Sequence, residues 1–330
     1  MKLGVLQFFS WPERRVDLAT VYARALERIE IMDRTGYDAV WLAEHHFSSF
    51  SVCPSVHMVG TLAAARTRRL RIGTAVSLAP FYHPLRLAEE VALLDVLSGG
   101  RVNWGAGRGF ARVEFTAFGV PPEESASRFR ETVEIVLQAW TDERLNFAGQ
   151  HFRFEDIELL PKPAQLPHPP VWMAASSEGA IEWAASRGFS ILMDPHSSSP
   201  EIGAKRRFYA EKLAAAGFSE TGRDIPIARL VAIAEDAGKA AAVARSGAEW
   251  ILNSYLGAQH RPVMQGSFTP AGVDPVQRYL GEVILHGTPD KVGDEILRLR
   301  EEIGLNYLLA APLSHQSFML LTEQVLPRIA

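Results

Sequence analysis

The sequence from Leu70 to Gly109, LRIGTAVSLAPFYHPLRLAEEVALLDVLSGGRVNWGAGRG, contains the clearest structural pattern of the chain. It begins with an apolar, partly β-branched run, Leu70 to Leu78, which predicts a strand. Apolar residues at helical spacing follow Pro84, and Ser98-Gly99-Gly100 ends this helix before a second strand, Arg101 to Trp104. Because a helix separates the two strands, we expect them to be parallel neighbours joined by a right-handed crossover.

The same alternation of strand and helix continues on both sides of this unit. Six further strands are predicted: Lys2–Phe9, Asp38–Ala43, Val171–Ala175, Phe189–Met193, Ile225–Ala234 and Asn306–Ala310. Eight strands alternating with helices predict an α/β fold, a (β/α)8 TIM barrel, in a single domain of residues 1–330. A half-barrel with a domain boundary is the alternative, and only residues 144–169 could supply that boundary.

Two segments interrupt the alternation, and we interpret both as insertions. After the fourth helix, Ser125 to Trp140, alternating residues around Gly149-Gln150 predict a hairpin, which a proline-rich stretch follows. After the seventh strand, residues 253–287 are rich in Gly and Pro and predict a lid. Residues 110–122 are predicted to be a polar and aromatic loop.

Composition excludes several classes of protein. The net charge of −4 and pI of about 6.2 predict no general attraction to nucleic acid or anionic membranes. The basic cluster Arg66, Arg68, Arg69 and Arg71 is interpreted as a solvated loop rather than a nucleic-acid site. The single cysteine, Cys53, suits a reducing compartment, and no apolar run reaches the roughly 20 residues of a membrane span. With no signal peptide recognisable before the first strand, we expect a cytoplasmic protein.

Two adjacent histidines follow the second strand. Neighbouring side chains at a strand end point to opposite faces, so at most one of His45 and His46 can face the barrel mouth. This argues against a two-histidine metal site, and no metal is expected. Each histidine can serve as a hydrogen-bonded structural residue or as a base.

Two strand ends carry residues suited to a phosphate. Gly107-Arg108-Gly109 offers a guanidinium fork and accessible backbone amides, and Ala175-Ser176-Ser177 places hydroxyls at the start of a helix. A tight turn with a surface arginine and a simple helix N-cap are the alternative interpretations. Because the two motifs follow neighbouring strands, together they could hold one terminal phosphate. The many aromatic residues near the strand ends could line a dry cavity over a flat ring.

Taken in order, the motifs of this chain resemble the bacterial luciferase-like monooxygenase family. The resemblance rests on Leu42–Phe47, Gly73–Val76, His83-Pro84, Leu94-Asp95, Ser98–Arg101, Gly107–Phe110, Ala175–Ser177 and Gly287–Pro289. It implies a flavin-dependent (β/α)8 barrel, in which His45 is the catalytic base beside the isoalloxazine ring and Glu44 its neighbour near the flavin. The dipeptide Ala75-Val76 would lie under the ring, where the family often has a non-proline cis peptide.

The resemblance also implies a cofactor and a reaction. The cofactor-binding residues would be Ala75, Val76, Gly107, Arg108, Gly109, Phe110, Ala175, Ser176 and Ser177. Reduced FMN, supplied by a transient flavin reductase, would react with dioxygen to a flavin hydroperoxide that oxygenates a small organic substrate. A homodimer is expected. Where luciferase proper has a cysteine and a glutamate, this chain has Gly107 and Ser176, which argues against light emission from a long-chain aldehyde.

Three other functions stay open on the sequence. A deazaflavin-dependent hydride-transfer oxidoreductase would use the same barrel and the same phosphate site. A non-catalytic flavin-binding protein would need no proton-handling histidine. A metal-dependent barrel hydrolase is the third. No Gly-x-Gly-x-x-Gly after a strand indicates a dinucleotide site in this chain.

Overall fold

The computed structural model describes residues 1–254 and 272–329, and its centre is a curled parallel sheet. The sheet order is β11-β10-β12-β1-β2-β3-β5-β8-β9, with β4 beside β5. The strands are β1 (Lys2–Gln7), β2 (Ala39–Leu42), β3 (Arg71–Thr74), β4 (Ser77–Leu78), β5 (Val102–Gly107), β8 (Val171–Ala174), β9 (Ser190–Leu192), β10 (Pro226–Ile233), β11 (Leu285–Gly287) and β12 (Tyr307–Pro312). One further parallel bridge joins Met193, just after β9, to Ile227 of β10. The sheet therefore curls, so that the chain just after β9, at one end of the strand order, comes next to β10 near the other end.

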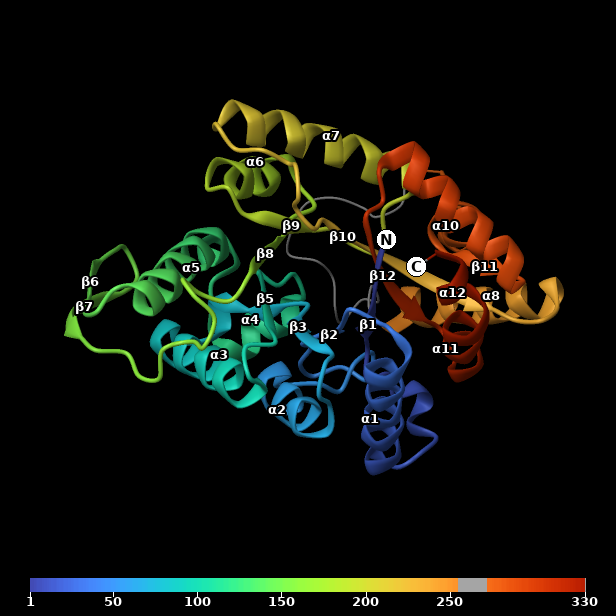
Figure 1. The fold of residues 1–330 in the computed structure, drawn as a ribbon, viewed down its shortest axis with the longest axis horizontal. Coiled ribbons are helices and arrows are strands. Elements are labelled where there is room, and N and C mark those ends of the chain that lie inside the picture. The colour runs from blue at the N-terminus through green and yellow to red at the C-terminus, as the bar shows by residue number, and fades with distance from the viewer. Residues whose placement is uncertain (255–271, 330) are drawn as a thin grey trace.

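Helices surround the strands (Figure 1). The longer ones are α1 (Leu18–Thr35), α2 (Val56–Arg66), α3 (Pro84–Ser98), α5 (Ser125–Thr141), α6 (Glu178–Ser186), α7 (Ser199–Ala215), α8 (Ala237–Ser254) and α10 (Pro289–Ile303). Shorter ones are α4 (Arg112–Phe118), α9 (Pro275–Arg278), α11 (His315–Leu320) and α12 (Leu326–Ile329). No helix within the described residues is long and apolar enough to cross a membrane.

Helix ends occur where the local sequence favours them. Asp17 caps α1 by accepting a hydrogen bond from the Thr20 amide, and Gly36 ends this helix with φ of 93°. Pro84 is the first residue of α3, and Gly99 ends it with φ of 71°. The central strand, helix and strand unit is confirmed, since β3 and β5 are parallel neighbours.

Side chains inside the curled sheet form their own core. Trp41 of β2 is fully buried there, edge-on to Trp172 at 5.2 Å, and its indole N–H donates to the Tyr307 hydroxyl. A Cβ on Gly73 would lie 2.3 Å from the Trp41 ring. Glycine at this position therefore makes room for the largest side chain of the interior. A second core lies between the strands and the helices.

Several sequence predictions need correction. The strand expected from Leu70 to Leu78 is two strands, β3 and β4, because Ala75 and Val76 leave the ladder between them. The loop expected at 110–122 contains α4, and the segment expected to be a lid contains α9, a π-helical turn (Tyr279–Val283) and β11. Residues 255–271 of that predicted lid lie outside the described residues.

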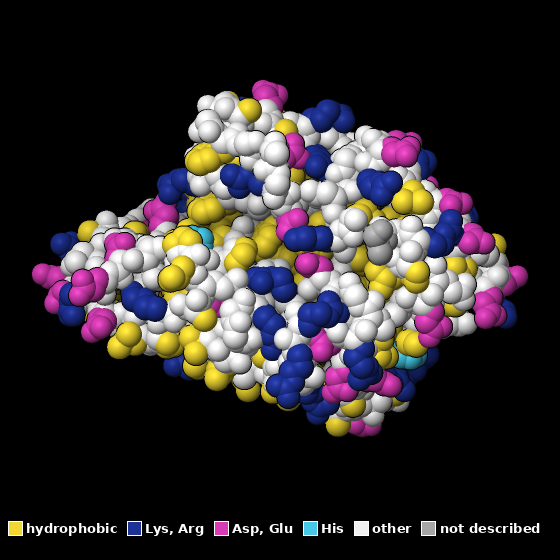
Figure 2. All heavy atoms as spheres, viewed as in Figure 1, with side chains coloured by type: hydrophobic (Ala, Val, Ile, Leu, Met, Phe, Trp, Pro, Cys, Tyr) yellow, Lys and Arg dark blue, Asp and Glu magenta, His cyan; other side chains and the backbone are white. Residues whose placement is uncertain are grey.

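The predicted hairpin is confirmed, whereas the basic cluster, predicted to be a solvated loop, extends from the end of α2 into β3. The hairpin forms from β6 (Leu145–Ala148) and β7 (Arg153–Ile157), a two-stranded antiparallel sheet separate from the main one. Lys and Arg side chains gather over β2, β3 and α2 in Figure 2. Within the basic cluster, Arg69 donates to carbonyl oxygens at the end of α1, and Arg71 donates to Asn103. These two arginines serve intramolecular contacts.

The buried hydroxyl of Thr74 joins β3 to β5 and generates a stability prediction. It donates to the Gly105 carbonyl at 2.7 Å and accepts from the Gly105 amide at 2.9 Å. Thr74→Val keeps the side-chain shape but leaves the amide and the carbonyl of Gly105 without this partner. We therefore expect the free energy of unfolding to fall by roughly 2–4 kcal/mol. Urea unfolding would measure the loss. The control is Thr35→Val, at an exposed position of α1, whose free energy of unfolding should stay within about 0.5 kcal/mol of the parent value. An equally small effect of Thr74→Val would contradict the assignment.

Candidate active site

His45 lies at the carboxyl end of β2 and faces the interior of the curled sheet. Its ring lies nearly parallel to Phe8 at 6.3 Å and edge-on to Phe50 at 5.4 Å, two side chains that pack on the inner core. Every second residue before it, Ala39, Trp41 and Ala43, belongs to the inner core, so His45 continues the inward-facing side of this strand. The His46 ring lies instead against Glu44 and Phe118, although both histidines line the small pocket described below.

Glu44 points the opposite way and is almost fully buried. Its Oε1 lies 3.0 Å from Nε2 of His46, and its Oε2 accepts hydrogen bonds from the Tyr82 hydroxyl at 2.9 Å and the Leu78 amide at 3.4 Å. Glu44 therefore holds His46 and the chain around β4 in place, and its carboxylate lies on the opposite side of the strand end from the His45 ring.

A second buried carboxyl, Glu114 of α4, lies beside the two histidines. Its Oε1 accepts a hydrogen bond from the His46 amide at 3.1 Å and lies 3.9 Å from Nδ1 of His45. Burial raises the pKa of Glu114 to about 7, against an ordinary value of 4.5. A carboxyl in this state can hold or release a proton near neutral pH.

A small pocket opens at these residues. The described residues that line it are His45, His46, Ser48, Phe110, Ala111, Glu114 and Ser254. Aromatic rings extend from it: Phe118 is edge-on to His46 at 4.8 Å and stacks on Phe81 at 5.1 Å. Phe47 adopts φ of 56° and is 60% exposed beside Phe118. This arrangement provides an apolar wall at the mouth.

The strand-three dipeptide lies against β5. The Ala75-Val76 peptide bond is cis, as the resemblance implies. A Cβ on Gly107 would lie 2.2 Å from Val76 Cγ2, so only glycine permits this approach. Gly109 has φ of 75° and lies under the Phe81 ring. The glycines predicted to approach a phosphate thus also bring β4 and β5 together.

Arg108 and Ser177 lie at the same end of neighbouring strands. Strands β5 and β8 pair in parallel with Ala106 opposite Met173, so both motifs begin just beyond the paired residues. Burial, and then the positive charge of Arg130 on α5, lower the pKa of Arg108. Ser177 is the N-cap of α6, but its side chain makes no capping hydrogen bond. Two guanidinium groups, a hydroxyl and helix amides are the donor set that suits a phosphate.

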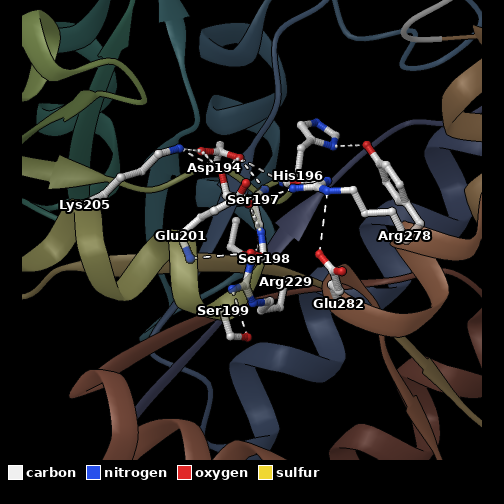
Figure 3. A network of polar contacts seen from close by, with 12 residues as sticks. Asp194, His196, Ser197, Ser198, Ser199, Glu201, Lys205, Arg229, Arg278 and Glu282 are labelled. Carbon is white, nitrogen blue, oxygen red and sulfur yellow. Dashed lines mark hydrogen bonds and ion pairs between the residues drawn. The ribbon is translucent and has the colours of Figure 1, made fainter. Parts of the chain in front are cut away.

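Another polar network lies just beyond the carboxyl end of β9 (Figure 3). Asp194, just after β9, accepts a hydrogen bond from Lys205 of α7 at 3.0 Å. Arg278 of α9 pairs with Glu201 at 2.7 Å, and the fully buried Arg229 of β10 donates to a carbonyl oxygen of the 194–198 loop. These contacts tie α7, α9 and β10 together.

With this geometry in view, comparisons with known proteins identify the family. The sequence profile described as luciferase-like monooxygenase matches residues 1–307. This chain belongs to the luciferase-like monooxygenase family. An uncharacterised protein of Sinorhizobium fredii, y4wF, is 33% identical over 88% of this chain and 85% of its own length. The oxygenase component of a flavin-dependent trigonelline monooxygenase from Acinetobacter baylyi is 31% identical over 55% of this chain and 51% of its own length.

Solved structures share the fold along the whole chain. The crystal structure of monooxygenase RslO1 from Streptomyces bottropensis covers 100% of both chains with a TM-score of 0.88 and 29% identity. The oxygenating constituent of 3,6-diketocamphane monooxygenase from Pseudomonas putida, in complex with FMN, covers 100% of this chain and 99% of its own, with a TM-score of 0.81 and 20% identity. This member of the family thus has an α/β fold that solved monooxygenase structures match along its full length.

Sequence reasoning missed Glu114 and Arg130. Glu114 precedes Phe115 and Phe118 at helical spacing, and Gly119 follows, which together are a short-helix signal within the predicted loop. Arg130 comes from the outer helix α5, so only tertiary packing brings it near Arg108. No group of three or more His, Cys, Asp or Glu side chains in residues 1–254 and 272–329 is arranged to hold a metal ion.

The raised pKa of Glu114 generates a pH prediction for stability. Because the native pKa of about 7 exceeds the ordinary 4.5, the carboxyl contributes stability that is fully present below pH 4.5 and lost as the pH rises through 7. The difference in free energy of unfolding between Glu114→Gln and the parent should therefore shift by roughly 3 kcal/mol in favour of the variant as the pH rises from 4.5 to 8. Denaturant unfolding at several pH values would measure this gain. The control, Glu123→Gln at an exposed site, should show no such trend, and a parallel trend in both variants would contradict the assignment.

Proposed function

We propose that this luciferase-like monooxygenase is the oxygenase component of a two-component system. It would bind reduced FMN delivered by a separate flavin reductase and use dioxygen to oxygenate a small organic substrate. The single observation that carries the proposal is the placement of a histidine with a buried carboxyl, His45 and Glu114, at the same sheet edge as the phosphate-type donors Arg108 and Ser177.

The residues of this edge fit FMN. Arg108, Arg130, Ser177 and the first amides of α6 would hold the phosphate, and Ala175 and Ser176 would border it. The ring system would lie against Ala75-Val76, with Gly107, Gly109 and Phe110 beside it. Reduced FMN bound there would supply the activation of dioxygen. The chain itself would orient the cofactor and keep water away.

His45 would move a proton between the reacting group and the protein. Its ring is held between Phe8 and Phe50, which leaves the imidazole little freedom to turn. Glu44 would act indirectly, because its oxygens are engaged by His46 and Tyr82. The aromatic wall around Phe118 would exclude water from the mouth.

The complete (β/α)8 barrel, with residues 1–330 as a single domain, belongs to the same proposal. The ordered path of the sheet leaves β9 at one end, and the Met193 bridge to β10 supports closure there. The β6–β7 hairpin and the segment that includes α9 and β11 would then be insertions.

A deazaflavin cofactor is the second candidate. The F420-dependent secondary alcohol dehydrogenase whose structure contains an F420-acetone adduct has a TM-score of 0.80 with this chain at 19% identity, which shows the shared fold alone. Such an enzyme would transfer hydride without dioxygen. Dependence on dioxygen therefore distinguishes the two candidates.

The test compares cofactors and phosphate contacts. The purified chain should bind FMN more tightly than riboflavin or F420 in fluorescence titrations. Its anaerobic complex with reduced FMN should consume dioxygen on mixing. Loss of one charged contact is worth roughly 1.5–3 kcal/mol, so Arg108→Gln should weaken FMN binding about 10- to 100-fold and riboflavin binding hardly at all. Equal losses for both flavins would remove Arg108 from the phosphate site, and F420 binding with hydride transfer would favour the second candidate.

A homodimer is also proposed, through the outer faces of α2 and α3. Large apolar side chains are exposed on this pair of packed helices, and hydrophobic atoms line the corresponding edge of the molecule in Figure 2. They are Met58 (76% exposed), Leu62 (44%), Leu93 (47%), Val96 (44%) and Leu97 (56%). A second copy of the same surface would cover this apolar area.

Substitution at this surface tests the homodimer. Leu97→Arg should convert the parent dimer to a monomer in light scattering, because two buried guanidinium groups would face one another across a two-fold axis. The exposed Leu166→Arg, outside α2 and α3, should leave the molar mass unchanged. A parent protein that is monomeric at micromolar concentration would overturn the proposal.

A further inference from the structure

His46 is a pocket-lining side chain to which the proposed reaction assigns no role. Its Nε2 lies 3.0 Å from Oε1 of Glu44, whose side chain is fully buried. Oε2 of the same carboxylate accepts from the Tyr82 hydroxyl at 2.9 Å and from the Leu78 amide at 3.4 Å. Because an ionised carboxylate can only accept hydrogen bonds, Nε2 carries the proton of the contact between His46 and Glu44. In the neutral imidazole the acceptor nitrogen is therefore Nδ1.

This acceptor is available to a ligand in the pocket. The His46 side chain is 12% exposed, and in the part of the chain that the structure describes no donor bonds to Nδ1 of this ring. Ser48 lines the same pocket, and its hydroxyl oxygen accepts from the Phe50 amide at 3.1 Å, which leaves the hydroxyl hydrogen to donate. One acceptor and one donor together suit a ligand hydroxyl, which both donates and accepts.

Aromatic rings beside His46 suit a flat, uncharged ligand. The ring centroids of Phe47 and Phe118 lie 5.8 Å and 4.8 Å from that of His46, and the two residues are 60% and 40% exposed. An aromatic ligand would pack on these rings in the edge-on or offset arrangements that such pairs prefer. No Lys or Arg is among the described residues that line the pocket. An anionic ligand would therefore lose its hydration there without a permanent counter-ion.

We propose that His46 is a specificity-determining residue and that the substrate carries a hydroxylated aromatic ring, as in a phenol. The inference rests on the proposed function and names its substrate class. The phenolic hydroxyl donates to Nδ1 of His46 and accepts from Ser48, while the ring packs on Phe118. A hydroxyl that donates a hydrogen bond is richer in electrons, which favours oxygenation of a carbon of its ring.

The reaction of a phenol balances with the components of the proposed function. One atom of dioxygen forms a C–O bond to a ring carbon, and the hydrogen of that carbon ends on the new hydroxyl. The other oxygen atom leaves as water with the two protons and two electrons of reduced FMN, which is oxidised. The product is a dihydroxybenzene. His46 neither gains nor loses a proton overall, because the original hydroxyl is intact in the product.

A purely structural role is the alternative, in which His46 serves only to hold Glu44. The test compares phenol with anisole, which has a methyl group in place of the hydroxyl hydrogen. The full chain is labelled with isotopic histidine, and the His46 signals are assigned by their loss in His46→Phe. Phenol should shift the Nδ1 signal and bind about 5- to 50-fold more tightly than anisole, which leaves the acceptor without a donor. Benzoate should bind more weakly than phenol because of its charge.

Substitutions separate the ligand contact from the structural role. His46→Phe keeps a ring and removes the acceptor, so its affinities for phenol and anisole should be equal. In His46→Gln, the amide N–H group can donate to Glu44 and the amide oxygen can accept from phenol, so part of the preference should return. His315→Phe, at an exposed position of α11, should keep the parent preference. The parent titration decides the inference even if His46→Phe fails to fold.

Equal affinities of the parent for phenol and anisole, or an Nδ1 signal that phenol leaves unchanged, would overturn the inference. With reduced FMN and dioxygen, the parent should also convert phenol to a dihydroxybenzene, and dioxygen consumption without this product would overturn it as well. The NMR titration needs no flavin. A preference for phenol in a chain that does not react with reduced FMN would therefore support the ligand class and count against the proposed function alone.

Discussion

The hydroxyl of Thr74 is the contact on which the arrangement of the site depends. The regular ladder between β3 and β5 stops at the pair Gly73–Asn103. Beyond it, this hydroxyl replaces the missing backbone partners by bonding both the amide and the carbonyl of Gly105. A Cβ on Gly105 would lie 2.0 Å from the Thr74 carbonyl oxygen, so the approach requires glycine. The chain can then leave the ladder at Ala75 and pair again with β5 as β4, with Ser77 opposite Ala106 and Leu78 opposite Gly107.

Much of the fold could be predicted because its signals are local. Pro84 and Gly99 mark the ends of α3 by their backbone preferences, and the apolar periodicity between them requires no knowledge of distant residues. The break at Ala75-Val76 could not be predicted from periodicity, because both residues are as apolar as a continuous strand would require. The π-helical turn and β11 were missed because short elements in a Gly- and Pro-rich stretch carry too few periodic residues to stand out.

The candidate site divides in the same way. Strand alternation alone indicated that His45 and His46 point to different sides, and the neighbouring strands indicated that Arg108 and Ser177 share an edge. Glu114 and Arg130 lie on the two successive helices α4 and α5 that come after β5, and the packing of these helices decides which side chains meet. Other motifs of the family are structural here: Asp95, for example, accepts hydrogen bonds from Gln165 and from the Val102 amide. A family motif therefore does not by itself mark a residue that contacts ligand.

The pKa values of two carboxyls near the carboxyl ends of the strands shift in opposite directions. Burial alone would raise the pKa of Asp194, but the charge of Lys205 and hydrogen bonds from the loop lower it to about 2. Glu114 is also buried, but it accepts one backbone hydrogen bond, and no lysine or arginine of residues 1–254 and 272–329 is among the groups that shift its pKa, which burial raises to about 7. A carboxylate with its charge fully compensated stabilises loops and helices at any ordinary pH. A carboxyl left between its two protonation states can take part in proton transfer, and it lies where His45 and the aromatic wall meet.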